Sequence, residues 1–304
     1  LLISLLKAMG IEAFPALVDT EETKRLIELP ATASVFNHVI VTLKQDGKRY
    51  WLDPTVSYQR GTLEYLAQPD YGYALIIDKG ESALTSMAQK PVHTNVSVED
   101  NFFIAEKVSE SSRFETQYTY AEFEAINRRN NIASSGLNSV AKSYFEYYQG
   151  FLNGLSINEA MAISEQEKTG NLITKESYLI SEFWEKTDEG YEASFYASEI
   201  QNSVYEPKQV NRTDPLYFDY PNIINTTIKL HFAEKGWGFD SDQEEIDNDY
   251  FNLKTATEFN NNVLTLTYSY YAKQDHIKAT QIDDYLTQRK KLISATHYPI
   301  LKYA

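Results

Sequence analysis

The spacing of apolar residues predicts a short helix at the start of the chain. Residues 1–9 read LLISLLKAM, in which the apolar side chains recur every three to four positions, as on one face of a helix. Gly10 stands where such a helix would stop, and Lys7 lies in its last turn. A helix this short resembles the second half of a longer one. We therefore expect the chain to begin inside a domain.

The residues after this helix predict an antiparallel sheet. Apolar runs typical of strands cover residues 11–20, 35–43, 48–52 and 71–78. Asp46-Gly47, between the second and third runs, is typical of a two-residue hairpin turn. We expect residues 1–90 to form one domain, with its boundary near Lys90-Pro91.

Beyond residue 91 the chain is dominated by short, alternating strand-like runs. They cover residues 92–120, 172–184, 191–200, 224–232 and 263–273. Two segments have helical composition instead, namely 121–149, with an interruption near 130–136, and 280–294. Many short strands with added helices are typical of a β-sandwich. The sequence thus predicts an α+β protein in which residues 91–304 form a β-sandwich-type domain with helical insertions.

Composition removes several classes of function. The chain has 304 residues and a formal net charge of −15, which argues against nucleic-acid binding. No apolar run is long enough to span a bilayer. The absence of cysteine excludes disulfides, thiolate metal sites and a cysteine nucleophile within these residues. Histidines lack zinc-site spacing and no Gly-rich phosphate loop is present, so we predict neither a metal nor a cofactor.

An acidic run near residue 245 suggests calcium at first sight. Its carboxylates are Asp240, Asp242, Glu244, Glu245, Asp247 and Asp249. The run lacks the glycine at position 6 and the glutamate at position 12 of an EF-hand loop. A solvated loop is the better interpretation.

Candidate chemistry lies in the predicted hairpin. His38 follows Asn37 in an apolar strand, and Asp53 ends the return strand just before a proline. Residues at such positions can be adjacent across an antiparallel pair. The Asp53 carboxylate would then hold one imidazole nitrogen of His38 and leave the other to take a proton from a nucleophile. By themselves, a strand histidine and an aspartate before proline are more often structural. Trp51 and Asn37 are the candidate substrate-binding residues, although Trp51 also suits a buried strand position.

Four strings, in order, resemble the bacterial transglutaminase-like family, which has the papain-like cysteine protease fold. They are LLISLLKAMGIEAFPALV, FNHVIV, DGKRYWLDPT and YQRGTL, within residues 1–78. The resemblance implies that His38 is the general base and Asp53 its orienting carboxylate. It also implies that residues 1–11 follow a nucleophilic cysteine, which would stand within about two helical turns before Leu1, where a helix N-terminus favours the thiolate. The β-rich remainder is similar in architecture to partner domains of this module.

Two functions are compatible with these observations. In one, the intact protein is a thiol acyl-transfer enzyme that hydrolyses a peptide or amide in a protein or peptide substrate, and the present chain, without its cysteine, is inactive. In the other, the module is catalytically inactive and the β-sandwich recognises a protein or glycan in binding or assembly. Similar modules occur in the bacterial periplasm or at the cell surface, which is the location that we expect. An exposed sandwich edge would offer a dimer contact.

Overall fold

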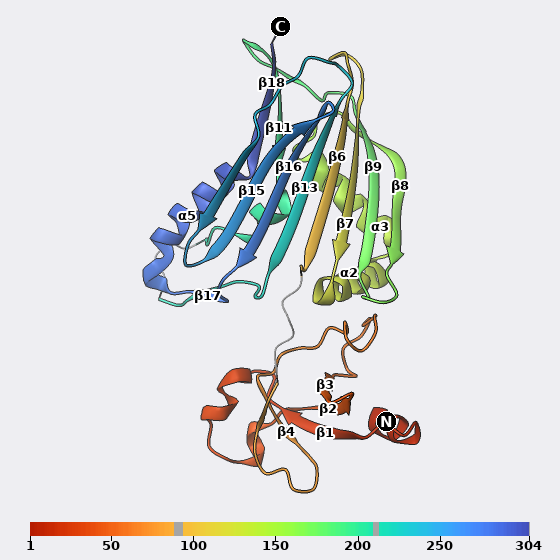
Figure 1. Cartoon of the computed structure of the whole chain (residues 1–304), viewed down its shortest axis with the longest axis vertical. Coiled ribbons are helices and arrows are strands. Elements are labelled where there is room, and N and C mark those ends of the chain that lie inside the picture. The colour runs from red at the N-terminus through yellow and green to blue at the C-terminus, as the bar shows by residue number, and fades with distance from the viewer. Residues whose placement is uncertain (88–93, 209–212, 304) are drawn as a thin grey trace. The chain divides into compact units, whose positions relative to one another are not determined.

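The computed structural model describes residues 1–87, 94–208 and 213–303 (Figure 1). The chain divides into two compact units, Leu1–Pro91 with Glu167–Gly170, and Val92–Gln166 with Asn171–Ala304. The boundary expected at Lys90-Pro91 lies outside the described residues. None of the described helices combines the length and the apolar composition that crossing a bilayer requires.

The first unit begins with helix α1, Leu2–Ala8, which ends at a glycine. Gly10 has a φ of +78°, a left-handed conformation that glycine adopts without steric cost. The Ile11 amide donates to the Leu6 carbonyl at 2.9 Å, and the Gly10 amide donates to the Lys7 carbonyl at 3.0 Å. These two bonds form the Schellman motif, which satisfies carbonyls that the helix end would leave free.

A five-stranded antiparallel sheet follows the helix. Its strands are β1 (Ala13–Val18), β2 (His38–Gln45), β3 (Lys48–Leu52), β4 (Tyr73–Ile76) and β5 (Thr85–Ser86), in the order β3-β2-β1-β4-β5. Two short 3-10 helices, η1 (Thr23–Glu28) and η2 (Ala33–Val35), connect β1 to β2. Asp46 and Gly47 both have positive φ in the turn between β2 and β3, as a type I′ hairpin turn requires.

Alternation along β2 gives this sheet two apolar faces. Val41 and Leu43 point to the face on which α1 packs. Ile40 points to the opposite face, where Ala16 of β1 lies directly across from it. His38 precedes Ile40 by two residues, so its side chain starts on the face that α1 does not cover.

The second unit is built on an eight-stranded sheet (Figure 1). Its strands are β6 (Val96–Ile104), β7 (Ser112–Tyr120), β8 (Leu155–Glu165), β9 (Leu172–Ile180), β13 (Ile223–Phe232), β14 (Asp242–Asp247), β15 (Phe251–Asn260) and β16 (Val263–Ala272). Their order is β14-β15-β16-β13-β6-β7-β9-β8. Neighbouring strands are antiparallel except at the centre, where β6 and β13 run parallel.

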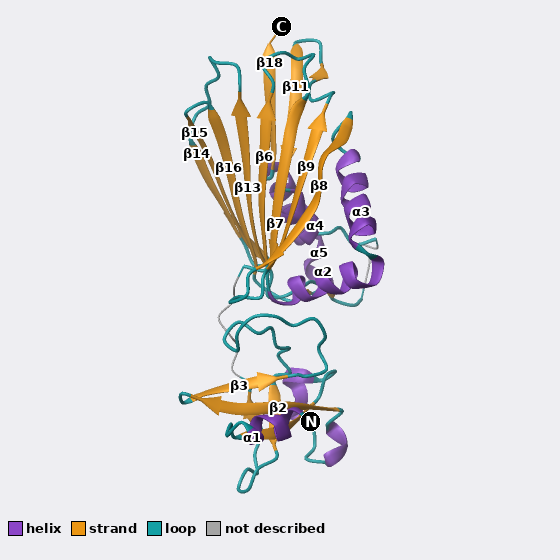
Figure 2. Cartoon of the chain, turned by 90° about the vertical axis from the view of Figure 1, so that its right-hand side faces the viewer, coloured by secondary structure: helices purple, strands orange, loops and turns teal. Residues whose placement is uncertain are grey.

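Helices lie against one side of this sheet (Figure 2). They are α2 (Glu122–Ser135), α3 (Leu137–Gln149), α4 (Ser198–Ser203) and α5 (Ile282–Ala295), with the 3-10 turn η3 (Ala279–Gln281) before α5. A small sheet of β10 (Glu185–Lys186), β11 (Gly190–Tyr196) and β18 (His297–Tyr303) shares the core, and β12 (Leu216–Tyr217) pairs with β17 (His276–Ile277). Phe102 of β6 stacks on Phe114 of β7 and meets Phe195 of β11 edge-on at 5.0 Å. The chain is therefore a mixed α/β protein made mostly of sheet.

Some local expectations differ from the structure. The strand expected over 191–200 ends at Tyr196, and the residues from Ser198 onward form α4. The expectation of a solvated loop is wrong for Asp242–Asp247, because these residues form the edge strand β14, hydrogen-bonded to β15. Lysines balance part of its charge, since Lys273 contacts Asp247 at 2.6 Å. Within the described residues, no three His, Asp or Glu side chains gather as metal ligands would.

Candidate active site

The hairpin of the first unit brings His38 and Asp53 into contact. Val41 pairs with Leu52, so Asp53 falls next along the register, beside Ile40 and diagonal to His38. His38 Nε2 lies 2.9 Å from Asp53 Oδ2. Two residues separated by the length of a hairpin therefore form one hydrogen-bonded pair at the end of the sheet.

Asp53 is held on both of its carboxylate oxygens. Its side chain is only 1% exposed. Thr55 donates its amide to Oδ1 at 3.0 Å and its hydroxyl to the same oxygen at 2.6 Å. Tyr71 donates its hydroxyl to Oδ2 at 2.9 Å, and the Asp53 amide donates to Gln68 Oε1 at 2.6 Å. The carboxylate has little freedom to turn away from His38.

These contacts decide which nitrogen of His38 carries a proton. Burial by itself would raise the pKa of Asp53, but the hydrogen bonds from Thr55, His38 and Tyr71 outweigh it and hold the pKa below its usual value. An ionised carboxylate can only accept, so Nε2 must donate. The lone pair is then on Nδ1, which makes no hydrogen bond within the part of the chain that the structure describes. The His38 side chain is 24% exposed.

Tyr71 is a member of the site that the sequence pattern did not indicate. Strand alternation would place it with Tyr73, away from Ile40. The chain instead turns at Gly72, which has a φ of +70°, and the Tyr73 amide donates to the Tyr71 carbonyl at 2.7 Å. This γ-turn suits glycine and directs Tyr71 toward Asp53. Burial, and then its bond to Asp53, raise the pKa of Tyr71, which keeps the hydroxyl protonated.

Thr55 and Gln68 were also missed, for different reasons. Thr55 follows Asp53 by two residues, the spacing of an Asx turn, so the Asp-Pro-Thr string held a usable signal. Gln68 lies in the loop between β3 and β4, and no local pattern marks it.

The two candidate substrate-binding residues have structural contacts. Trp51 pairs with Thr42 across the hairpin and packs in the apolar cluster on the His38 face, with the Arg49 guanidinium 5.7 Å from its ring. Asn37 accepts the Thr20 amide on its side-chain oxygen at 2.9 Å. Asn37 thus stabilises the chain where β1 ends. Substrate binding by Trp51 or Asn37 stays a prediction.

Replacing Tyr71 by Phe is expected to raise the pKa of Asp53 and to cost about 1–2 kcal/mol of stability at neutral pH, because a donor to a buried carboxylate is lost. Carboxyl-carbon NMR titration of Asp53 and urea unfolding measure the two effects. Tyr73→Phe is the matched control, since the Tyr73 hydroxyl makes no hydrogen bond with the residues that the structure describes. An unchanged Asp53 titration in Tyr71→Phe would show that the Tyr71 hydroxyl does not lower the pKa of Asp53.

Comparison with known proteins gives one structural likeness. No family model matches the chain, and no curated protein matches it. A crystal structure of a protein from Parabacteroides distasonis, described as a "putative protease", matches with a TM-score of 0.50 and 10% sequence identity. The match covers 98% of this chain and 42% of that one, so the chain spans less than half of the length of the neighbour. At 10% sequence identity the match shows a similarity of fold alone.

Proposed function

We propose that His38 and Asp53 are the general base and the orienting carboxylate of a thiol acyl-transfer centre that hydrolyses a peptide or amide bond. The observation that carries the proposal is the 2.9 Å contact of His38 Nε2 with a buried, hydrogen-bonded Asp53, which leaves Nδ1 without a hydrogen bond among the described residues. A histidine held in one tautomer by a carboxylate is the arrangement that activates a nucleophile.

The chemistry assigned to each residue follows from this tautomer. His38 Nδ1 takes the thiol proton, and the thiolate sulfur attacks the carbonyl carbon to form a C–S bond. When the C–N bond breaks, the resulting imidazolium returns the proton to the leaving amine. Water then attacks the thioester while Nδ1 takes its proton, which releases the acid and the thiol. Asp53 stays ionised throughout and stabilises the imidazolium.

The thiol must come from residues outside this chain, since the chain has no cysteine. The resemblance of residues 1–78 to the transglutaminase-like family supports a cysteine on a continuation of α1. Because α1 packs on the Val41 face, that thiol would have to reach His38 around the end of the sheet, where β2 begins. The description of the structural neighbour as a putative protease agrees with hydrolysis.

The test is a longer form of the protein that includes the residues before Leu1, assayed on peptide amides. We expect a cysteine there, and we expect its replacement by Ala, or replacement of His38 by Gln, to lower kcat/KM by about 10³-fold or more. Lys44→Gln, on the same strand and away from the pair, is the control and should keep full activity.

Two outcomes would overturn this proposal. One is a preceding segment without cysteine, which would favour the inactive binding or assembly protein. The other is a His38→Gln variant that hydrolyses substrate at the original rate.

A further inference from the structure

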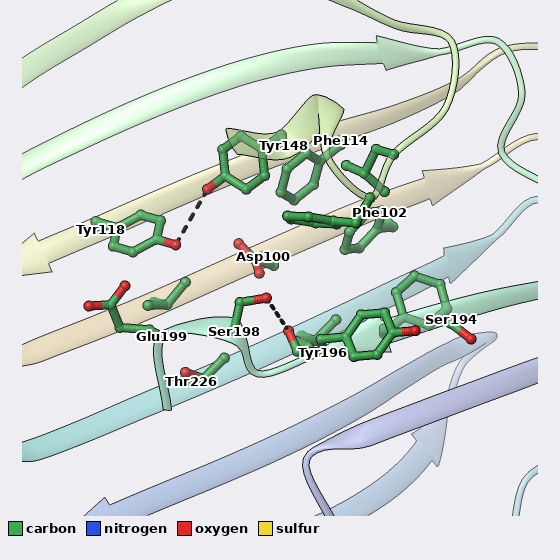
Figure 3. A pocket seen from close by; sticks show the side chains of 15 residues that line it. Asp100, Phe102, Phe114, Tyr118, Tyr148, Ser194, Tyr196, Ser198, Glu199 and Thr226 are labelled. Carbon is green, nitrogen blue, oxygen red and sulfur yellow. Dashed lines mark hydrogen bonds between the residues drawn. The ribbon is translucent and has the colours of Figure 1, made fainter. Parts of the chain in front are cut away.

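A small cavity lies inside the second unit, under the centre of the large sheet (Figure 3). Its volume is about 20 Å³, room for one water-sized group. Strands β6, β7, β11 and β13 and helix α4 contribute side chains to it, and the end of α3 closes one side. Figure 3 shows Asp100 in the middle, with Tyr118 and Tyr148 on one side and Glu199 and Thr226 on the other.

Asp100 lacks a charged partner among the residues that the structure describes. Thr116 donates its hydroxyl to Asp100 Oδ1 at 2.6 Å, whereas Oδ2 has no hydrogen-bond partner among these residues. No Lys, Arg or His in the described ranges forms an ion pair with it. Asp100 is half-buried, because part of its surface opens onto the cavity. Its depth beneath the sheet, and to a smaller extent the nearby Glu99, raise its pKa to about 7 despite the Thr116 bond. An ionised carboxylate in this position calls for a cation.

Thr226 supplies a second, independent sign of a binding site. It is 2% exposed and lines the cavity, and its hydroxyl oxygen has no hydrogen-bond partner in the described part of the chain. Thr226 lies across from Val98, two residues from the position that pairs with Asp100, and therefore on the same face of the sheet. A buried hydroxyl without a partner costs free energy that a bound donor would restore.

The walls of the cavity are suited to a cation rather than to an anion. Seven aromatic side chains line it: Phe102, Phe114, Tyr118, Tyr148, Phe151, Phe195 and Tyr196. Aromatic ring faces attract cations, and Glu199 adds a second carboxylate. The Tyr148 hydroxyl donates to the Tyr118 hydroxyl at 3.4 Å.

We propose that this pocket binds the ammonium head of a primary alkylamine, with Asp100 Oδ2 and Thr226 Oγ1 accepting its N–H groups. A primary ammonium matches the cavity in size and in donor number, whereas a trimethylated one is too wide. The alkyl stem would leave the pocket past Phe151 and Tyr196, whose side chains line the cavity and are 41% and 36% exposed. This site is independent of the function proposed for His38.

Calorimetric titration with butylammonium chloride at about pH 8.5, where the amine is protonated and Asp100 is ionised, tests the proposal. Saturable one-to-one binding is expected. Butanol, which has the same stem without charge, and tetramethylammonium, which has the charge in a wider head, should not bind at equal ionic strength. At about pH 5.5 the wild-type protein should lose the affinity, because Asp100 is then protonated.

Variants separate the two proposed contacts. Asp100→Asn and Thr226→Val should each weaken butylammonium binding, the first by at least about tenfold. Glu99→Gln removes an equal charge from the same strand on its other face and should bind like the wild type. Absence of binding to the wild-type protein, equal binding of butanol, or unchanged affinity in Asp100→Asn would each overturn the proposal.

Discussion

Replacing Asp53 by Asn is expected to lower the stability of the β2–β3 hairpin and its sheet by about 2–4 kcal/mol at neutral pH. The substituted amide would keep the shape of the carboxylate but could accept hydrogen bonds on only one oxygen. Its NH₂ group would face either the two Thr55 donors or the His38 and Tyr71 donors. Two donors directed at each other in a buried site are both left unsatisfied.

The size of this effect should depend on pH in a defined direction. The pKa of Asp53 is lowered in the folded protein, so the carboxylate contributes stability above its unfolded pKa of about 3.9. That contribution is lost as the pH falls through the lower, folded pKa. The difference between wild type and Asp53→Asn should therefore be full at neutral pH and shrink below about pH 4.

Hydrogen exchange of peptides covering residues 38–53, followed as a function of pH, measures this loss of stability. Asp46→Asn is the matched control, because Asp46 lies in the same hairpin, is exposed and accepts no side-chain hydrogen bond from the described residues. Equal exchange rates in Asp53→Asn and wild type would show that the Asp53 contacts add no stability to the sheet.

Asp100→Asn is expected to act in the opposite direction and to stabilise the second unit at alkaline pH, by up to about 4 kcal/mol. The pKa of Asp100 is raised from 3.8 to about 7 in the folded protein, since the charge is buried and no cation of the described residues pairs with it. Ionisation of a group with a raised pKa opposes folding. Asparagine has no charge to desolvate and can still accept the Thr116 hydroxyl.

The sign of the pH dependence separates this mechanism from a general packing effect. Asp100 costs nothing below its unfolded pKa, and its cost grows between about pH 4 and pH 7 and then levels off. Thermal unfolding of Asp100→Asn should therefore match wild type near pH 4 and exceed it at about pH 8.5. Glu99→Gln should give no gain, since Lys229 lowers the pKa of Glu99. A less stable Asp100→Asn at alkaline pH would refute the unpaired-charge interpretation.

These two carboxylates differ because of their partners. Donors surround Asp53, and its ionised form stabilises the fold. Asp100 has a single side-chain donor among the described residues, and its ionised form opposes folding. A residue kept at a cost to stability is typical of a binding or catalytic site, which agrees with the amine pocket proposed above.

Features that depend on neighbouring residues could be predicted from the sequence. Gly10, Asp46-Gly47 and Gly136 lie where α1 ends, where β2 turns into β3, and where α2 gives way to α3, because positive φ favours glycine and a few other residues regardless of the fold. The contact of His38 with Asp53 could also be predicted from residues close in the sequence. One hairpin joins the two residues, and its turn sets the register that brings them together.

Other features were decided by the tertiary structure. The strand expected over 71–78 gave no sign that Tyr71 reaches Asp53, because the turn at Gly72 that directs it there is not a strand feature. The acidic residues of β14 form a strand because β15 offers them a hydrogen-bonding partner. Thr226 and Asp100 line the same cavity only because β13 pairs in parallel with β6, far away in the chain. Adjacent residues determine the local backbone conformation. The partners of a buried charge depend instead on which distant strands pair.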